Sequence, residues 1–200
     1  EIYKHLKKYL KHKQVGGYNL FSFYAKYLRK FSKNKKITNY LDFGCGSCTK
    51  TYSFGKALKL TAKQIHGCDI SEWGDYSDKT RNTDNIQFTK IEKNKKLPYK
   101  TNTFDVISTM MVLHHVENIS HTVKELSRIL KNDGYLFIKE HDAKNDAERM
   151  MMDIEHGLYE VVYRNNKDFY NSYFAIYYSI KQLRKILEKV FKICSWNKLG

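Results

Sequence analysis

Two glycines and one aspartate carry the clearest chemical signal in this sequence. Residues 40–47 are an apolar run that ends in a turn containing Gly44 and Gly46, and Asp69 follows later in the chain. A strand that ends in a Gly-x-Gly turn, with a carboxylate at the end of the next strand, is how an α/β sheet forms a nucleoside-cofactor site. The dinucleotide pattern needs a third glycine, and Thr49 stands at that position. We therefore expect a nucleoside cofactor of another class.

A second chemical signal is a polar run, Lys139, Glu140, His141 and Asp142, at the end of a strand that should be buried at its middle. Ligands bind at the carboxyl ends of the strands in open α/β sheets, so this edge is the expected substrate side. Imidazole has an unperturbed pKa near about 6.5, so His141 can act as a general base, oriented by Glu140 or Asp142. The alternative is that these residues cap the next helix.

Histidines elsewhere in the chain offer further candidates. Glu155, His156 and Tyr159 share one face of a predicted helix because they lie three and four residues apart, and they either close over the same site or form a buried polar patch. His114 and His115 follow the fourth predicted strand. Adjacent side chains point in different directions, so we expect at most one to face the site, and a structural role is favoured over that of a base.

The cysteines bear on metal and redox chemistry. Cys45 and Cys48 have the spacing of a redox or zinc motif, but the sequence shows no second pair and no histidine cluster beside them. We therefore expect no metal site. The 4 cysteines are expected to be thiols in a reducing compartment, the cytoplasm.

Several segments together resemble one enzyme family. Residues 42–47 resemble the first motif of class I S-adenosylmethionine-dependent methyltransferases, commonly Asp-x-Gly-x-Gly-x-Gly, with Cys48 at the last glycine. Residues 66–71 resemble the second strand of that family. Residues 104–116 resemble its fourth motif, as found in quinone-biosynthesis C-methyltransferases, and residues 123–138 resemble the helix and fifth strand that follow. The motifs occur in the family's order, which makes the resemblance specific.

The resemblance implies S-adenosyl-L-methionine as the cofactor. Asp42 would order the loop and the cofactor's ammonium, and Asp69 would bind both ribose hydroxyls. The complete set of cofactor-binding residues that it implies is Asp42, Gly44, Cys45, Gly46, Asp69, Ile70, Ser108 and Met110. The residues that we expect to be catalytic are His141, Glu140, Lys139 and His156.

The elements that must position these residues alternate between strands and helices. The predicted strands are 37–43, 64–69, 86–91, 104–109, 134–139 and 191–196, and residues 132–134 are the expected turn into the fifth. This pattern predicts a Rossmann-like α/β fold, with a mostly parallel central sheet and helices on both faces. The last antiparallel strand of the family has no room before Gly200, so either the sheet is shortened or the chain is part of a longer protein.

We expect a single domain over residues 1–200. Residues 1–36 read as a basic helical prelude that packs across the cofactor pocket, and residues 140–178 as an inserted segment on the substrate side. No segment approaches the ~20 apolar residues that a membrane crossing needs, so no membrane partner is expected.

The charge of the chain bears on its acceptor. There are 36 Lys and Arg residues against 21 Asp and Glu, a net charge of +15, which favours a polyanion such as RNA. Coding bias is the alternative cause, because the chain has 16 tyrosines and only 1 proline. RNA is the favoured acceptor, and an mRNA cap is one form of it. Viral cap methyltransferases resemble this chain in the run before Lys139, and they have a lysine at that strand end. A small molecule is the alternative, as is a methyltransferase-like subunit that supports a catalytic partner.

Overall fold

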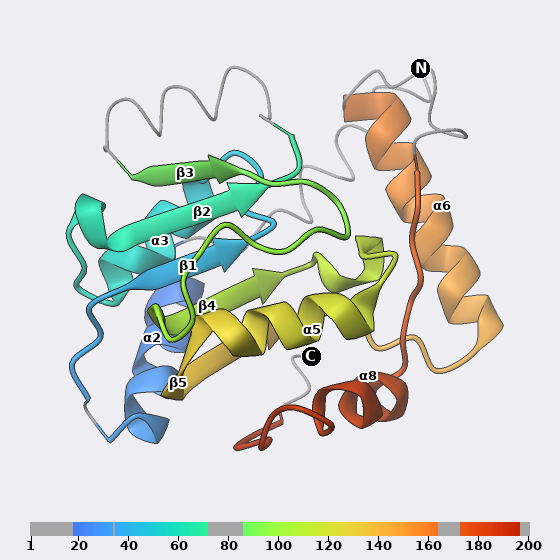
Figure 1. The fold of residues 1–200 in the computed structure, drawn as a ribbon. Coiled ribbons are helices and arrows are strands. Elements are labelled where there is room, and N and C mark those ends of the chain that lie inside the picture. Colours follow the sequence, from blue (N-terminus) through green and yellow to red (C-terminus); the bar gives the residue numbers. More distant parts are fainter. Residues whose placement is uncertain (1–17, 34, 72–85, 164–172, 197–200) are drawn as a thin grey trace.

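The computed structural model of the chain describes residues 18–33, 35–71, 86–163 and 173–196. Its strands are β1 (Tyr40–Phe43), β2 (Ile65–Asp69), β3 (Gln87–Lys90), β4 (Phe104–Met110) and β5 (Leu130–Lys139). They form one sheet in the order β3-β2-β1-β4-β5 (Figure 1). Every neighbouring pair is parallel, which confirms the predicted Rossmann-like α/β fold.

The strand order reverses at the centre of the sheet. From β1 the chain first adds β2 and β3 on one side, and it then crosses back to add β4 and β5 on the other. In open α/β sheets a ligand crevice lies at such a reversal, outside the carboxyl ends of the strands. The fold therefore places its binding edge at the ends of β1 and β4, where residues 43–47 and 111–115 follow.

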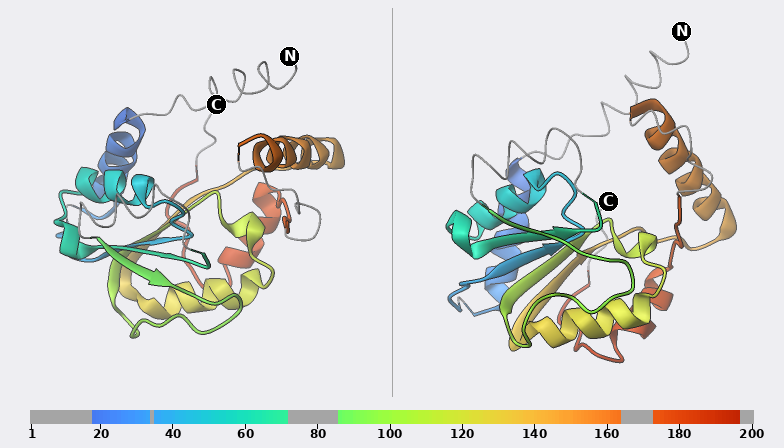
Figure 2. Two further views of the ribbon diagram at one scale, coloured as in Figure 1. Left: turned by 90° about the horizontal axis from the view of Figure 1, so that it is seen from above. Right: turned by 45° about the horizontal axis from the view of Figure 1, so that its top comes forward.

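Helices cover both faces of the sheet (Figure 2, left). The helix α2 (Tyr18–Phe31) and the helix α3 (Thr49–Ala57) lie on one face, and α5 (Ile119–Ile129) and α8 (Ile180–Leu187) lie on the other. Successive strand residues point to opposite faces. Tyr40 accordingly packs with the α2 and α3 side chains, whereas Leu41 packs with those of α5.

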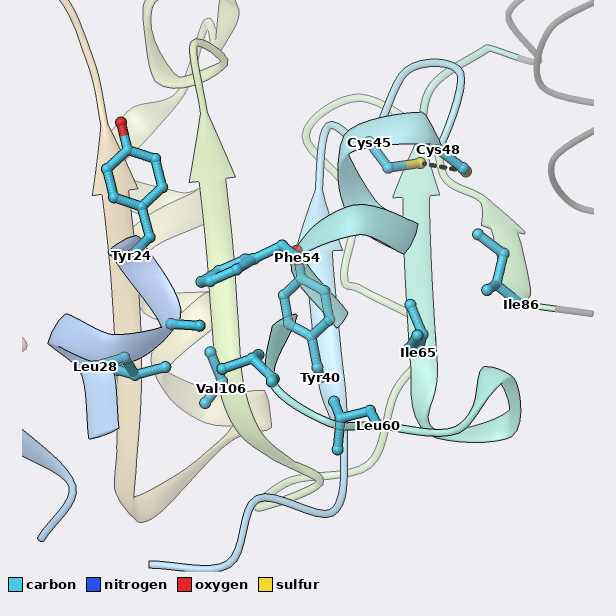
Figure 3. Close-up of a cluster of buried hydrophobic side chains, with 12 residues drawn as sticks. Tyr24, Leu28, Tyr40, Cys45, Cys48, Phe54, Leu60, Ile65, Ile86 and Val106 are labelled. Carbon is cyan, nitrogen blue, oxygen red and sulfur yellow. Dashed lines mark hydrogen bonds between the residues drawn. The ribbon is translucent and has the colours of Figure 1, made fainter. Parts of the chain in front are cut away.

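The core under α3 is built largely from aromatic rings. Phe54 of α3 meets the ring of Tyr40 edge to face, with 5.4 Å between the ring centroids. Figure 3 shows both side chains between the sheet and the helix, with Val106 of β4 and Leu28 of α2 in the same cluster. Such packing fixes the height of α3 over β1, and thus the path of the turn that joins them.

The part of α2 that the structure describes does not lie where the prelude was expected. Its Tyr24 and Leu28 are buried against the sheet face beside α3, rather than across the cofactor edge. The prediction of a prelude packed across the pocket is therefore wrong for residues 18–31. The helix buries an apolar stripe, and the sheet face offers the larger apolar surface. Residues 1–17 lie outside the described residues.

The prediction of a turn at residues 132–134, before the fifth strand, is wrong. Those residues lie inside β5, which starts at Leu130. Phe104 pairs with Leu130, but two residues later Val106 pairs with Tyr135, so the extra residues of β5 form a bulge. The turn-forming residues thus interrupt the ladder locally without ending the strand.

The sixth predicted strand, residues 191–196, does not form. Its backbone joins no ladder, and the segment runs on from α8 as an irregular stretch. Phe191 packs into the core under α5 and α8, and the Ser195 hydroxyl bonds the Tyr27 hydroxyl of α2. Alternating apolar residues predict a strand only where a partner strand presents free backbone groups.

Two 3₁₀ turns and one long helix complete the described chain. The turns are η1 (Ala62–Gln64) and η2 (Leu113–His115), and the helix is α6 (Asp146–Tyr163). In both figures α6 lies beyond the carboxyl ends of β4 and β5, apart from the layers of the sheet. No helix among the described residues combines the length and apolar character that a bilayer crossing needs.

Candidate active site

The glycine turn after β1 is bonded directly to the end of β2. The backbone N–H of Gly44 donates to the carbonyl of Cys68 at 2.8 Å, and the N–H of Gly46 donates to Asp69 Oδ2 at 2.8 Å. The other carboxylate oxygen, Oδ1, accepts a longer bond of 3.4 Å from Ser71 N–H. Asp69 thus holds the turn closed while its Oδ1 keeps lone pairs for a further donor.

The two glycines of the turn serve different needs. Both adopt positive φ, +73° at Gly44 and +52° at Gly46. A Cβ at Gly44 would lie 2.4 Å from Cγ1 of Val112, so this position is closed by the segment after β4. A Cβ at Gly46 would meet nothing within 4 Å. The first glycine therefore lets two segments approach, and the second faces open space that a ligand can fill.

The cysteines of the turn are part of its packing. Cys48 occupies the place of the family's last glycine and adopts the left-handed conformation that favours glycine, with φ +62°. Its buried Sγ lies 3.4 Å from that of Cys45, which is also buried. Gly67 of β2 leaves room for them, since a Cβ there would lie 2.8 Å from Cys45 Sγ.

Asp42 lies beneath the turn in a buried hydroxyl network. Its Oδ1 accepts from the Ser108 hydroxyl at 2.5 Å and its Oδ2 from the Thr51 hydroxyl at 2.6 Å, and the Tyr40 hydroxyl bonds Ser108 at 2.7 Å. Burial raises the pKa of Asp42 to about 6, although both hydroxyl bonds oppose the shift. The network ties β1, β4 and α3 together, and it places Ser108 in the protein interior.

The remaining cofactor candidates follow the strands. Ile70 comes directly after Asp69 and is 42% exposed. Met110 ends β4 and is paired in register with Lys139 at the end of β5. Lys139 is half-buried, and burial together with the charge of Lys50 lowers its pKa. These residues therefore line the same edge as the turn.

Glu140, directly after β5, organises the neighbouring strand end. Its Oε1 accepts from the backbone N–H groups of Val112 and Leu113 at 2.7 and 2.6 Å, and its Oε2 bonds His114 Nδ1 at 2.7 Å. Burial alone would raise the pKa of Glu140, but the bond with His114 and the two backbone donors outweigh it and lower the pKa. An ionised carboxylate thus fixes both η2 and the ring of His114.

Three histidines from three elements meet at this edge, and we call His114, His141 and His156 the histidine cluster. Their ring centroids lie 5.1, 5.2 and 5.3 Å apart. The ring of Tyr177 stacks on His114 at 5.5 Å. Burial and the neighbouring His114 and His156 lower the pKa of His141 to about 4, so its imidazole is neutral at neutral pH.

Other predicted site residues have different positions. Asp142 Oδ1 accepts from Ile180 N–H at 2.9 Å, in the first turn of α8, and not from the next helix, α6, which the alternative interpretation named. On α6 His156 joins the cluster, and the side chain of Tyr159 is 37% exposed. His115 lies beside the cluster, with its ring centroid 4.0 Å from that of His114 and 5.7 Å from that of His156, and its Nδ1 bonds the carbonyl of Phe174 at 2.8 Å.

The sequence analysis missed the roles of His114 and Tyr177. His114 was open to detection, because it and His141 follow strands that are neighbours in this family, and neighbouring parallel strands end at one edge. Tyr177 had no such signal. Its segment is held near the cluster by a backbone bond of 2.7 Å from Ile176 N–H to the His114 carbonyl, which no local pattern announces.

Comparison with known proteins identifies the family. Residues 17–190 match the methyltransferase domain family. An uncharacterized methyltransferase of Schizosaccharomyces pombe is 32% identical over 54% of this chain and 41% of its own length. Protein MJ0638 of Methanocaldococcus jannaschii is 31% identical over 82% of this chain and 77% of its own. Demethylmenaquinone methyltransferase of Staphylococcus saprophyticus is 35% identical over 48% and 41%. The chain thus spans about two fifths of the length of two of these relatives.

Solved structures share the fold at low sequence identity. YcgJ of Bacillus subtilis superposes with a TM-score of 0.59 at 19% identity, over 82% of this chain and 66% of that one. Phosphoethanolamine N-methyltransferase 2 of Haemonchus contortus, bound to S-adenosylhomocysteine, gives 0.58 at 15%, over 82% and 35%. The Haloferax volcanii complex between the Trm112 methyltransferase activator and a methyltransferase gives 0.58 at 16%, over 85% and 75%. With its parallel sheet and its glycine turn bonded to Asp69, this chain belongs to the methyltransferase domain family, among the class I S-adenosylmethionine-dependent methyltransferases.

Proposed function

We propose that this chain binds S-adenosylmethionine at the ends of β1 and β2 and transfers its methyl group to an acceptor at the ends of β4 and β5. One observation carries the cofactor half of this proposal: the open position at Gly46 lies in a turn bonded directly to Asp69. Among the described residues Asp69 Oδ1 accepts only one long bond, of 3.4 Å from Ser71 N–H, so it is suited to accept from a ribose hydroxyl. The exposed Ile70 side chain offers apolar surface beside it.

The cofactor supplies an activated methyl group when bound, so the chain itself must bind, orient and deprotonate. Gly44, Cys45 and Gly46 form the turn under the cofactor's amino-acid part, and Asp42, just before that turn, ties β1 to β4 and α3 through Ser108 and Thr51. Met110 lies at the end of β4, between the turn and the histidine cluster. Because β4 lies between β1 and β5 in the sheet, we propose that the methyl group is transferred near Met110.

The histidine cluster is the proposed acceptor side. His141 or His156 removes a proton from the acceptor, and Glu140 positions the cluster through His114. Lys139, paired with Met110 at the same edge, contributes positive charge beside the acceptor. The three rings pack on one another with centroids about 5 Å apart and form one compact surface, against which we propose that a small-molecule acceptor lies. The demethylmenaquinone and phosphoethanolamine enzymes named above act on small acceptors, as their names state.

RNA remains the second candidate acceptor because of the net charge of +15. A basic hollow of about 270 Å³ is lined by Arg29, Lys35, Lys36 and Lys59, among others. It adjoins the amino ends of β1 and β2, at the edge opposite the cofactor turn, so it does not add to the acceptor site. A supporting protein partner, as in the Haloferax volcanii complex, is a further alternative for the whole protein.

A methyl-transfer screen separates these candidates. The purified chain is incubated with radiolabelled S-adenosylmethionine and a quinol precursor, an amino alcohol, capped RNA or uncapped RNA, with Asp69→Ala as the inactive control. We expect label on a small acceptor, with little dependence on salt. Label on RNA, weakening steeply with salt because phosphate contacts release counterions, would decide for the second candidate. Failure with every acceptor, in a chain that binds the cofactor, would favour the supporting-subunit alternative.

A further inference from the structure

The histidine cluster has the composition of a metal site. His114 follows β4, His141 follows β5 and His156 lies on α6, so residues far apart in the sequence converge. One ring nitrogen from each lies within 4.8 Å of those of the other two. Three imidazole nitrogens on one Zn²⁺ ion, each at about 2.0–2.1 Å, would lie about 3.4 Å apart. Side-chain movements on the order of 1 Å would bring these three into that arrangement.

The outer partners of the rings are those of metal-binding histidines. His114 Nδ1 bonds the carboxylate of Glu140 at 2.7 Å, and that carboxylate is itself held by two backbone N–H groups. His156 Nδ1 bonds the carbonyl of Met152 at 2.9 Å. A metal-ligating histidine almost always donates its other N–H to a carboxylate or a carbonyl, which fixes the ring and leaves Nε2 with its lone pair. Both rings are therefore set in the tautomer that binds a metal through Nε2.

Two of the inner nitrogens have no protein partner. Nε2 of His114 and Nε2 of His141 are buried and make no hydrogen bond within the described ranges. His114 is only 2% exposed. A buried polar atom without a partner is costly and calls for an explanation such as an ion. A single cation between the rings would satisfy both atoms at once.

We propose that His114, His141 and His156 bind one divalent transition-metal ion, Zn²⁺ being the reference case. Neutral imidazoles favour zinc and its neighbours, whereas Mg²⁺ and Ca²⁺ prefer oxygen ligands. Three protein ligands leave a fourth position open, the pattern of catalytic rather than structural zinc sites. The ionised Glu140 lies directly behind His114 and offsets part of the ion's charge.

The open position gives the ion a role in the proposed reaction. With their ring nitrogens on the ion, His141 and His156 would not act as bases. The ion would instead hold an oxygen or nitrogen atom of a small acceptor beside the end of β4 and lower the pKa of that group, so that its proton leaves to solvent before the methyl group arrives. This role rests on the proposed function. Binding of the ion by itself does not, and the two are tested separately.

The test is metal binding by the whole chain without cofactor. The protein is stripped with a chelator, titrated with Zn²⁺ by calorimetry, and reconstituted with Co²⁺ for visible spectroscopy. We expect one ion per chain, and a Co²⁺ spectrum of four-coordinate type without thiolate charge-transfer bands. The absence of those bands distinguishes the cluster from the neighbouring Cys45 and Cys48 pair.

Variants locate the ion. His141→Ala and His156→Ala should each weaken Zn²⁺ binding by more than 100-fold, and Glu140→Gln by about 10–100-fold through the outer partner. His66→Ala, in β2 away from the cluster, is the matched control and should bind normally. His156 is only half-buried, so its replacement by alanine should disturb the fold less than a change at the buried His114. The His156→Ala variant therefore tests metal binding even if a His114 variant unfolds.

Two results would overturn the site: no stoichiometric Zn²⁺ binding by the parent chain, or full binding by the His141→Ala/His156→Ala double variant. Methyl transfer by metal-free protein at the parent rate would refute the catalytic role and leave the proposed function standing. Zn²⁺ binding without methyl transfer to any acceptor would support the metal site and refute the proposed function.

Discussion

Asp69 connects the local structure to the proposed chemistry, because one carboxylate oxygen closes the glycine turn and the other can accept from a ligand. Replacing it by alanine would remove up to two hydrogen bonds to the ribose, each worth about 1.5–3 kcal/mol with a charged acceptor. We expect Asp69→Ala to bind S-adenosylhomocysteine at least ten-fold more weakly in calorimetry. Asp133→Ala, whose side chain is 71% exposed in the bulge of β5, is the control and should bind normally. Equal affinity in the two variants would refute the role of Asp69.

If Asp42 holds the cofactor's ammonium as proposed, its pKa makes cofactor binding depend on pH. Its raised pKa of about 6 means that the carboxyl is neutral below that pH and ionised above it. An ionised Asp42 attracts the ammonium of the cofactor, so affinity for S-adenosylhomocysteine should fall as pH is lowered from 8 through about 6. Calorimetry at several pH values measures this, and Asp42→Asn should show a flat profile. The same pH dependence in Asp42→Asn would assign the effect to another group.

At this scale the sequence predicted the cofactor side better than the acceptor side. Gly44, Gly46 and Asp69 belong to one local pattern, so their types and spacing were sufficient to predict that the glycine turn and Asp69 lie together, while their binding of the cofactor stays a prediction. The histidine cluster depends on α6 and on the segment around Tyr177, which reach the edge through tertiary contacts. A periodic pattern shows that His156 shares a face with its neighbours, but not which of them points at another element.

Among the elements, the turn between β1 and α3 offers the sharpest contrast. Gly44→Ala should lower the free energy of unfolding by more than Gly46→Ala, because its Cβ would overlap Val112, whereas the cost at Gly46 is the left-handed conformation alone, about 1–2 kcal/mol. Urea unfolding measures both. In calorimetry Gly46→Ala should still lose cofactor affinity, since its methyl group enters the open space. A stable Gly46→Ala variant with full affinity would show that the ligand does not lie there.

A buried carboxylate joins β4 to the segment before β1. Asp105 Oδ2 accepts from Thr38 N–H at 2.9 Å, from the Thr38 hydroxyl at 2.7 Å and from Asn39 N–H at 3.0 Å, and its Oδ1 bonds Lys131 Nζ at 2.8 Å. Burial alone would raise the pKa of Asp105, but these partners outweigh it and lower the pKa from 3.8 to about 2. The carboxylate therefore stabilises the fold above its unfolded-state pKa.

The sign of this shift sets a pH dependence. Stability from Asp105 should be complete above about pH 5 and be lost as pH falls through the folded-state pKa of about 2. Asp105→Asn should therefore cost about 2 kcal/mol at pH 7, and its difference from the parent chain should shrink between pH 4 and 2. Urea unfolding across this range measures both chains. A difference that stays constant would show that the pKa of Asp105 is not shifted.

The elements themselves were largely predictable, and the two errors at strands, unlike the misplaced prelude, have a common cause. Buried parallel strands such as β1 and β4 read as apolar runs bounded by turns, so their positions followed from the sequence. The bulge at residues 132–134 and the irregular segment 191–196 depend instead on what the neighbouring strand offers. Turn-forming residues and alternating apolar residues describe a local preference, and pairing across the sheet overrides it.

For the molecule as a whole, the reversal of strand order brings the two candidate sites together. The cofactor turn follows β1 and the histidine cluster follows β4 and β5, so both lie at the carboxyl edge that α6 overhangs (Figures 1 and 2). Among the described residues, Arg29, Lys35, Lys36 and Lys59 line a hollow near the opposite edge of the sheet. The single-domain boundaries proposed from the sequence remain a prediction.

The most direct test of cofactor binding at this edge is an NMR titration of the chain, labelled selectively on its 10 glycines, with S-adenosylhomocysteine. The account predicts saturable shifts, complete at one equivalent, for the amides of Gly44 and Gly46. Gly55 in α3 and Gly134 in the bulge of β5 serve as internal references and should move little. Absence of saturable shifts at Gly44 and Gly46, or shifts confined to the reference glycines, would contradict it.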